Sequence, residues 1–161
     1  MPSILSARGG SGDEIKVFSL HPPSGTPLPV SQAGWTATSS VNGTTAPLSV
    51  DGNLATRFTT ATNATAGQWL EVNMGKPTTF SLITMDTYGQ LPGCTDYARG
   101  YAVYVSSNGS TWTPLAMGNG SSAIVTTSFA TQTAQYIQVQ VTQTLGPWWS
   151  IAELNVYTLS P

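Results

Sequence analysis

The chain has very few charged residues. Asp, Glu, Lys and Arg make up only 7% of its 161 residues, against about a quarter in an average soluble domain. Hydroxyl and amide side chains and glycine must therefore cover much of its surface, as in many secreted proteins, and these groups can exchange hydrogen bonds with water or with sugar hydroxyls. The net charge of −2 disfavours nucleic acid and anionic membranes as partners, because both attract cationic proteins.

Cysteine and long apolar runs are also scarce. The single cysteine, Cys94, excludes an internal disulfide, and its neighbours Gly93 and Thr95 carry no cation that would activate the thiol. No run approaches the ~18 apolar residues of a membrane span. Arg8 interrupts the apolar stretch near residue 1, so this stretch is not typical of a signal peptide. The composition indicates a secreted or cell-surface module excised from a larger multidomain protein.

Breaker residues divide the chain near residue 28. Residues 1–27 include the Pro-rich stretch HPPSGTPLP, which cannot continue a helix or a central strand, and we expect a linker or the tail of a preceding module. Within them, residues 15–20 (IKVFSL) could form a short edge strand. Residues 28–161 are predicted to form one domain, which is long enough to bury a core.

Short β segments separated by turn signals fill the predicted domain. They are expected at residues 35–40, 69–75, 80–88, 100–107, 111–117, 123–129, 134–144 and 151–159. No segment keeps a helical period over three turns, whereas residues 134–143 alternate polar and apolar side chains. The pattern predicts an all-β fold, an antiparallel β-sandwich of the jelly-roll type. Its expected core residues are Phe80, Trp112, Ile137, Val139 and Leu154.

Two distant segments carry oxygen donors that suit a hard cation. Asp51, Asn53 and Thr56 lie close together in VDGNLATRF, and Glu153 lies near the other end of the chain. Carboxylate, hydroxyl and carbonyl oxygens are the ligands that calcium prefers, so the two segments are predicted to meet at a calcium ion. The alternative is that Asp51 caps a type I turn through Asn53 and that Glu153 faces solvent.

The segment WWSIAELNVY, residues 148–157, combines an aromatic pair with a strand pattern. Ile151, Leu154 and Val156 can face a core while Trp148 lies beside solvent at the mouth of the strand. Sugar recognition needs an apolar face that stacks on a pyranose ring, together with fixed polar groups. Trp148 is therefore the predicted stacking residue of a carbohydrate site.

Polar side chains of the middle loop could accompany this stacking residue. Arg99 offers a fork of donors and Asp96 a paired acceptor. Three further residues could add adaptable contacts, and they are Tyr88, Gln90 and Tyr97. The alternatives are that Asp96 and Arg99 form a surface ion pair that holds this loop, and that Tyr97 packs in the core.

An enzyme is not expected from these residues. Glycoside hydrolysis needs two carboxyl groups that face each other, and the spare pair, Asp86 and Asp96, is expected instead to cap turns and pair with Arg99. The predicted domain has no histidine, since His21 lies in the Pro-rich stretch, and this excludes Ser-His-Asp chemistry. No nucleotide-binding motif or zinc spacing occurs.

Five segments, taken in order, resemble the F5/8 type C (discoidin) family and, within it, the bacterial family 32 carbohydrate-binding modules. They are SVDGNLATRF, GQWLEVNMG, DYARGYAVYVSSNGSTW, AQYIQVQV and WWSIAELNVY. The likeness runs from about Leu28 to Tyr157. It implies an eight-stranded jelly roll with the galactose-binding-domain-like fold, a structural calcium ion, and ligand loops gathered at one end of the sandwich.

The resemblance also implies roles for particular residues. The implied calcium ligands are Asp51, Asn53, Thr56 and Glu153, with Ser49 and Ala152 as carbonyl donors. The implied ligand loops are residues 36–47, 59–67, 87–99 and 143–149. Trp149 takes a position that the family usually buries, which leaves Trp148 to stack on a sugar.

The function implied is that of a noncatalytic module that anchors an attached secreted enzyme or surface protein to a glycan. Galactose-binding members tend to carry a histidine in the first loop, and this chain has none there. A glucan or another neutral polysaccharide therefore fits as well as galactose. Two alternatives are a discoidin-type adhesion module that binds protein or lipid headgroups, and a spacer without a ligand. The loops hold one Arg and no Lys, which makes membrane binding the weaker prediction.

Overall fold

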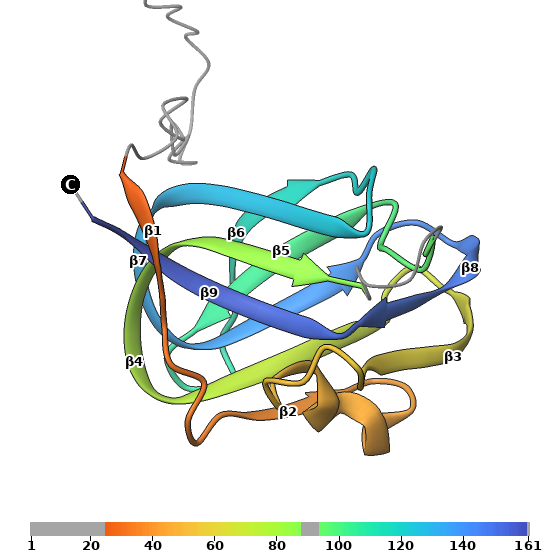
Figure 1. Ribbon diagram of the computed structural model, residues 1–161, viewed down its shortest axis with the longest axis horizontal. Coiled ribbons are helices and arrows are strands. Elements are labelled where there is room, and N and C mark those ends of the chain that lie inside the picture. Colours follow the sequence, from red (N-terminus) through yellow and green to blue (C-terminus); the bar gives the residue numbers. More distant parts are fainter. Residues whose placement is uncertain (1–24, 88–93, 161) are drawn as a thin grey trace, which may run out of the picture.

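The computed structural model describes residues 25–87 and 94–160, which form one β-sandwich (Figure 1). In chain order the elements are β1 (Thr26–Pro29), β2 (Thr36–Ser39), the 3-10 helix η1 (Gly43–Ser49), β3 (Phe58–Ala64), β4 (Trp69–Asp86), β5 (Tyr101–Ser106), β6 (Thr113–Gly118), β7 (Ile124–Val141), β8 (Leu145–Ile151) and β9 (Glu153–Ser160). The predicted all-β, antiparallel architecture is confirmed. The strand expected at residues 15–20 lies outside the described residues.

The two longest strands, β4 and β7, pass through both layers of the sandwich. Residues 69–73 of β4 pair with residues 136–140 of β7, and residues 78–86 of β4 pair with residues 124–134 of β7. Register shifts between these stretches let both strands bend. One layer is therefore β1-β9-β4-β7 and the other is β2-β4-β7-β5-β6, and both strands curve between the layers at the left of Figure 1.

Alternating side chains explain why these segments form strands. In β4, Leu70, Val72 and Met74 are buried while the residues between them are partly exposed. β7 repeats this pattern with Ile137 and Val139 on its buried face. Each strand thus turns one apolar face to the gap between the layers, where the core lies.

Four of the five predicted core residues are confirmed. These residues, all with no exposed surface, are Phe80, Ile137, Val139 and Leu154. The prediction is wrong for Trp112, which is only partly buried. Trp112 stands just outside the ladder between β5 and β6, whose last pair is Val105 and Thr113.

Several predicted strand ends are absent because the chain bends without leaving the sheet. The segments expected at 69–75 and 80–88 are one strand through residue 86, and those expected at 123–129 and 134–144 are one strand through residue 141. Gly75 takes a φ of 76° at the bend of β4, a conformation that favours glycine. A turn residue therefore marks a bend in the strand here rather than its end.

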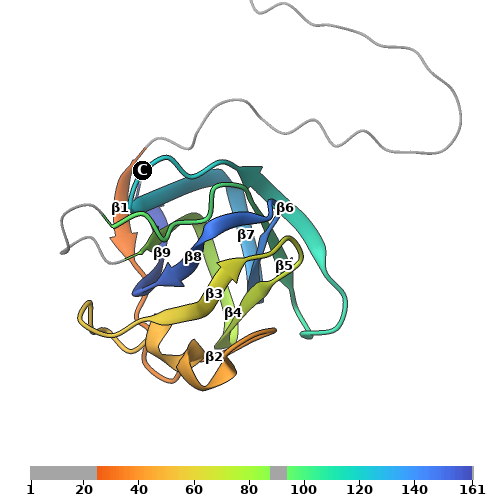
Figure 2. The same ribbon diagram turned by 90° about the vertical axis from the view of Figure 1, so that its right-hand side faces the viewer.

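Two segments predicted as ligand loops are strands. β3 covers much of the loop expected at 59–67, and β8 covers most of the loop expected at 143–149. They form a separate two-stranded antiparallel sheet, which faces the viewer in Figure 2. β3 is rich in Thr, Ala and Asn, and Ala61 has a φ of 54° where the register shifts. Pairing with β8, rather than local propensity, makes β3 a strand.

The described chain begins at the sheet edge. β1 starts at Thr26, just before the predicted domain boundary at residue 28, and pairs with the end of β9. Among the residues that the structure describes, no helix has the length and apolar character needed to cross a membrane.

Replacing Trp149 should destabilise the fold strongly. Trp149 is 1% exposed, and its ring meets that of Phe58 edge-on with 5.3 Å between the centroids. Trp149→Ala leaves a cavity there and should lower the free energy of unfolding by about 3–5 kcal/mol in urea denaturation. The matched control is Trp148→Ala, because that neighbouring side chain is 42% exposed; it should cost less than about 1 kcal/mol. Equal losses for the two variants would contradict this assignment of the core.

Candidate functional site

Hydrogen bonds gather distant segments at one end of the sandwich. The Ser150 N–H donates to the Asp96 carbonyl at 2.8 Å, and the Thr142 N–H donates to the Gly100 carbonyl at 2.9 Å. The Gly120 N–H donates to the Arg99 carbonyl at 3.1 Å. We call this surface the loop end, and it comprises residues 58–64, 94–100, 119–120 and 142–150.

The two adjacent tryptophans of β8 have opposite environments. Trp149 is buried as expected, and its N–H donates to the hydroxyl of Thr60 at 3.0 Å. Trp148 lies opposite Asn63 of β3 and has 42% of its surface exposed. Because buried Trp149 and its backbone hydrogen bond hold β8, the neighbouring Trp148 is presented from a fixed strand.

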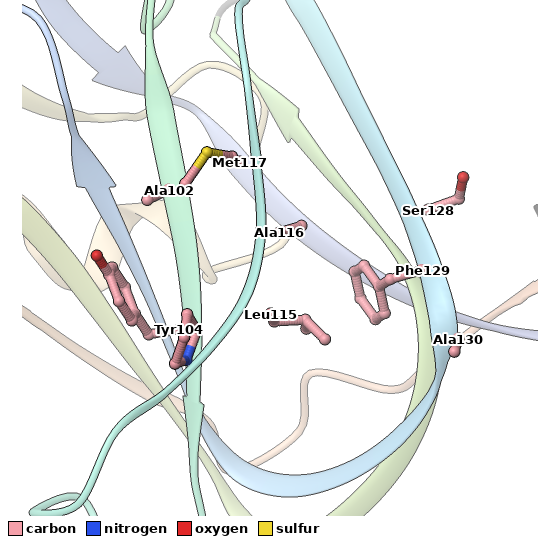
Figure 3. Close-up of a pocket in the computed structure, with 9 residues that line it drawn as sticks. Ala102, Tyr104, Leu115, Ala116, Met117, Ser128, Phe129 and Ala130 are labelled. Carbon is pink, nitrogen blue, oxygen red and sulfur yellow. The ribbon is translucent and has the colours of Figure 1, made fainter. Parts of the chain in front are cut away.

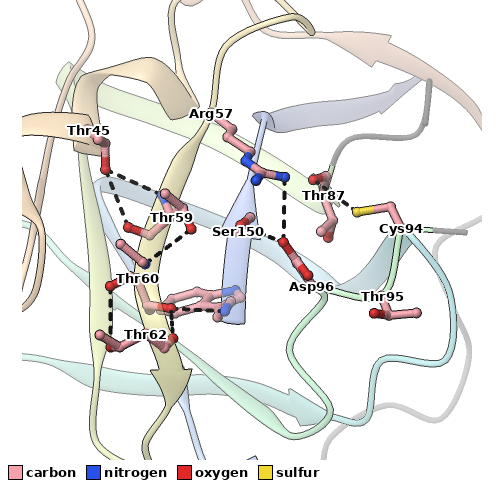
Figure 4. Close-up of polar contacts among 12 residues, drawn as sticks. Thr45, Arg57, Thr59, Thr60, Thr62, Thr87, Cys94, Thr95, Asp96 and Ser150 are labelled. Carbon is pink, nitrogen blue, oxygen red and sulfur yellow. Dashed lines mark hydrogen bonds and ion pairs between the residues drawn. The ribbon is translucent and has the colours of Figure 1, made fainter. Parts of the chain in front are cut away.

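Asp96 is held by two partners, and neither is the predicted one. Its Oδ2 accepts a hydrogen bond from the Ser150 hydroxyl at 3.3 Å and pairs with the Arg57 guanidinium at 3.5 Å (Figure 4). The predicted pairing of Asp96 with Arg99 is therefore wrong, because Arg57 just before β3 occupies that place. Our prediction missed Arg57. The available signal was its position next to Thr56 in a chain with only five Lys and Arg residues.

Arg99 stacks on Tyr97 instead. Its guanidinium carbon lies 3.9 Å from the centroid of the Tyr97 ring, and the group donates to the Tyr97 hydroxyl and to the Thr95 carbonyl. Tyr97 is partly buried and packs against the core, so the alternative considered for it is right in part. Glycine is needed at position 120 because a Cβ there would lie 2.3 Å from the Ala98 carbonyl oxygen, and it would also lie 3.1 Å from the Tyr97 ring. The predicted residues Tyr88 and Gln90 lie outside the described residues.

The turn after η1 and the start of β9 come together as predicted. The Asn53 N–H donates to Asp51 Oδ1 at 2.9 Å and to Glu153 Oε1 at 3.0 Å. The Thr56 hydroxyl donates to Asp51 Oδ2 at 2.7 Å. Asp51 thus does cap its own turn, but the alternative that Glu153 faces solvent is wrong, because Glu153 is only 3% exposed.

The environment of the buried Glu153 carboxyl destabilises its charged form. Burial raises its pKa above the ordinary value, and the adjacent Asp51 carboxyl also raises it. The Gln32 side chain, which donates to Glu153 Oε2 at 3.0 Å, opposes this rise, as do two backbone N–H groups. The groups that oppose the rise, the Gln32 amide and the two backbone N–H groups, are all neutral. Our prediction missed Gln32, which lies 121 positions away and has no signal in the sequence.

The donors at this turn fit a hard cation. Two adjacent carboxylates can neutralise a divalent ion, and the Thr56 hydroxyl and nearby backbone carbonyls are hard oxygen ligands. The expected carbonyl donors are Ser49, which lies just before this turn, and Ala152, which lies just before Glu153, and both are fully buried. Within the described residues no three His, Cys, Asp or Glu side chains cluster. Sites for soft metals, which need thiolate or imidazole, do not fit.

An apolar hollow lies elsewhere on the domain. It has a volume of about 580 Å³ and lies between β6 and β7, where Leu115 and Phe129 point toward each other (Figure 3). Its other lining side chains include Pro114 and Met117 and none that is charged. Its lining side chains are mostly apolar, apart from Tyr104 and Ser128, so it offers few hydrogen-bond partners to sugar hydroxyls, and the loop end is the better candidate.

Comparison of the sequence with models of known protein families identifies the family of this chain. The sequence model of the F5/8 type C domain matches residues 34–154. The chain belongs to the F5/8 type C domain family. A search of curated proteins found no match. The predicted resemblance to this family and to its family 32 modules is confirmed.

Solved structures similar to this F5/8 type C domain include bacterial family 32 modules. The family 32 module of Clostridium perfringens NanJ, in complex with galactose, is 27% identical, with a TM-score of 0.70 over 82% of this chain and 99% of that chain. Chitosan-binding module 1 of a chitosanase/glucanase from Paenibacillus sp. IK-5 is 28% identical, with a TM-score of 0.64 over 76% and 93%. The C-terminal domain of a Bacteroides fragilis chitobiase, 18% identical with a TM-score of 0.67 over 83% and 100%, shares the fold.

The raised pKa of Glu153 predicts a pH dependence. The folded protein holds this proton more tightly than the unfolded chain, so the stabilisation is complete below about pH 4 and is lost as the pH rises through the folded pKa. In metal-free buffer, the free energy of unfolding of the wild type minus that of Glu153→Gln should therefore fall as the pH rises above about 4. Urea denaturation at a series of pH values measures it. A difference that is flat or rises with pH would contradict the raised pKa.

Proposed function

We propose that this F5/8 type C domain is a noncatalytic carbohydrate-binding module that holds an attached secreted enzyme or surface protein on a neutral glycan. The observation that carries the proposal is Trp148, an exposed ring on a strand whose neighbour Trp149 is locked into the core. An exposed aromatic face on a rigid support is what a pyranose ring needs for stacking. The low charge of the chain supports a neutral partner and a secreted or cell-surface location.

Polar groups around Trp148 can orient the sugar. Arg99 is fixed by its stacking on Tyr97, and two of its nitrogens already donate within the protein, which leaves further N–H groups for ligand hydroxyls. Asn63 lies opposite Trp148 across the β3–β8 pair. Asp96 contributes indirectly, because Arg57 and Ser150 engage its carboxylate and thereby hold residues 94–100 against β8.

The similar structures support a carbohydrate ligand without specifying it. The NanJ module is described in complex with galactose, and the Paenibacillus module is named as chitosan-binding. Both are above 25% identical to this chain, yet their named ligands differ. The similar structures therefore support a carbohydrate ligand, and we infer that the loop side chains of this chain select the sugar.

The proposal excludes hydrolysis at the loop end. A glycosidase needs two carboxyl groups available to the substrate. Asp96 is instead paired with Arg57 and hydrogen-bonded by Ser150. Glu153, at the start of β9, is buried against the Asp51 turn and is therefore not available to a substrate.

We further propose that the Asp51 turn and Glu153 hold a structural calcium ion. Asp51 and Glu153 would supply carboxylate oxygens, Thr56 a hydroxyl oxygen, and Asn53, Ser49 and Ala152 carbonyl oxygens. When bound, calcium would neutralise the two adjacent carboxylates and link the turn to β9. The raised pKa of Glu153 supports this, since a buried carboxyl beside another carboxyl lacks a compensating cation.

Calcium should stabilise the domain. A ligand that binds only the folded state at about 100 times its Kd adds roughly 2.7 kcal/mol to the free energy of unfolding. Thermal melting with calcium and with EDTA should therefore give a clear difference in Tm for the wild type. The control Asp51→Asn keeps the turn acceptor but loses a charge, and it should show a much smaller difference. An unchanged wild-type Tm, with no metal found by elemental analysis, would remove the calcium site from the proposal.

Sugar binding should be weak and centred on Trp148. A single shallow site of this kind gives micromolar to millimolar affinity, or roughly −4 to −8 kcal/mol, so firm anchoring needs several modules. Calorimetric titration with neutral oligosaccharides should show that Trp148→Ala loses more affinity than Arg99→Ala, whereas Trp148→Phe keeps part of it. Equal binding by all variants would place the site elsewhere. Binding of lipid or protein alone would replace this function with adhesion.

A further inference from the structure

A second surface of the domain has the chemistry of a glycan platform. It is the outer face of the layer β2-β4-β7-β5-β6. Along β4 and β7 the buried residues alternate with residues that point away from the core, and the strand register aligns the outward residues in cross-strand rows. Six of them form what we call the polar sheet face, and they are Trp69, Glu71, Tyr104, Tyr136, Gln138 and Gln140.

Three aromatic rings on this face are partly exposed and have free polar edges. The hydroxyls of Tyr104 and Tyr136 and the indole N–H of Trp69 make no side-chain hydrogen bond to any described residue. The Tyr136 ring packs closely on Gly109, because a Cβ added to this glycine would lie only 3.2 Å from the ring. Tyr104 projects from β5 at one side of the apolar hollow, which it helps to line (Figure 3). Trp69 and Tyr136 do not line that hollow, and none of the three rings is fully buried.

The rings are spaced for a chain rather than for a single sugar. Tyr136 and Tyr104 lie on adjacent strands, two residues apart in register, which gives about 8 Å between them. Trp69 lies opposite Gln140, four residues along β7 from Tyr136, which gives about 14 Å between Trp69 and Tyr136. The aromatic positions thus span a distance longer than one pyranose ring, so only an extended oligosaccharide could reach them together.

The polar residues between the rings suit a neutral ligand. Gln138 sits between Glu71 and Tyr104 in one cross-strand row, and Gln140 sits beside Trp69 in the next. In the rows that these six residues define, Glu71 is the one charged side chain within the described residues. An anionic polymer would find no cationic side chain to pair with there. A basic partner could pair only with the Glu71 carboxylate. Amide and hydroxyl groups between rings match sugar hydroxyls instead.

The polar sheet face continues into the loop end. The Ser40 hydroxyl donates to the carbonyl of Trp69, and Gln140 donates to the carbonyl of Gly67. The adjacent Ala66 N–H donates to the Thr144 hydroxyl just before β8. A chain bound at Trp148 could therefore extend over this edge onto Trp69.

We propose that the polar sheet face binds an extended, neutral polysaccharide chain, as a second site that continues from the loop end. The proposal rests on the carbohydrate-binding function, but it concerns a different face of the sandwich and a longer ligand. Its test must therefore separate the two sites.

The experiment uses the full chain carrying Trp148→Ala, which disables stacking at the loop end. Cellohexaose, laminarihexaose, xylohexaose and mannohexaose are titrated, each beside its monosaccharide, and binding is followed by calorimetry and by amide chemical shifts. We expect monosaccharide binding to be lost and at least one hexasaccharide to be retained, with shifts in β4, β5 and β7. Adding Trp69→Ala and Tyr104→Ala to this variant should then weaken hexasaccharide binding roughly tenfold.

Two control variants distinguish ring stacking from general damage. Tyr104→Phe keeps the ring and should retain most of the hexasaccharide affinity. Tyr157→Ala removes a partly exposed tyrosine from the outer face of the other layer and should leave binding unchanged.

The two proposals fail in different ways. If no hexasaccharide shifts the amides of β4, β5 and β7, or if Tyr157→Ala weakens binding as much as Tyr104→Ala, the polar sheet face is not a glycan site. If the wild type binds no saccharide at the loop end while the hexasaccharide still perturbs the sheet, the loop-end function fails and the second site stands.

Discussion

The pairing of β4 with β7 is the constraint on which the rest of the structure depends. Both strands run through both layers, and they stay paired with each other on either side of the register shifts. β9 and β1 attach to one half of this pair, and β2, β5 and β6 attach to the other. Because the core lies between the two halves of one bent ladder, loss of that ladder would separate both layers at once.

This arrangement also explains why distant residues share a site. β9 pairs with β4, and Glu153 at the start of β9 lies at the Asp51 turn. There the backbone N–H of Asn53, 100 positions away in the chain, donates to the Glu153 carboxylate. β8 turns back toward β3 and carries Trp148 to the loop end. Sheet register thus brings together residues that the chain separates, for the proposed calcium site and the proposed sugar site alike.

Much of the fold could be predicted from the sequence, whereas less of the candidate sugar site could. Alternation in residues 134–143 identified a strand with Ile137 and Val139 inside, and the order of family segments indicated the architecture. β3 was not predictable, because its Thr-rich sequence has no strand pattern of its own. The partners of Asp96 were not predictable either, since Arg57 reaches it only after β3 and β8 have paired.

The sequence by itself determined the strand faces, the oxygen-rich turn at Asp51 and the low charge of the surface, because each of these follows from local composition or from a period of two along the chain. The burial of Trp149 was predicted from the family resemblance. Only the tertiary structure decided that Gln32 and Asn53 bond Glu153, that Arg57 displaces Arg99 from Asp96, and that Trp69, Tyr104 and Tyr136 share one face. These outcomes depend on strand register, and register is set by how whole strands pack rather than by any one segment.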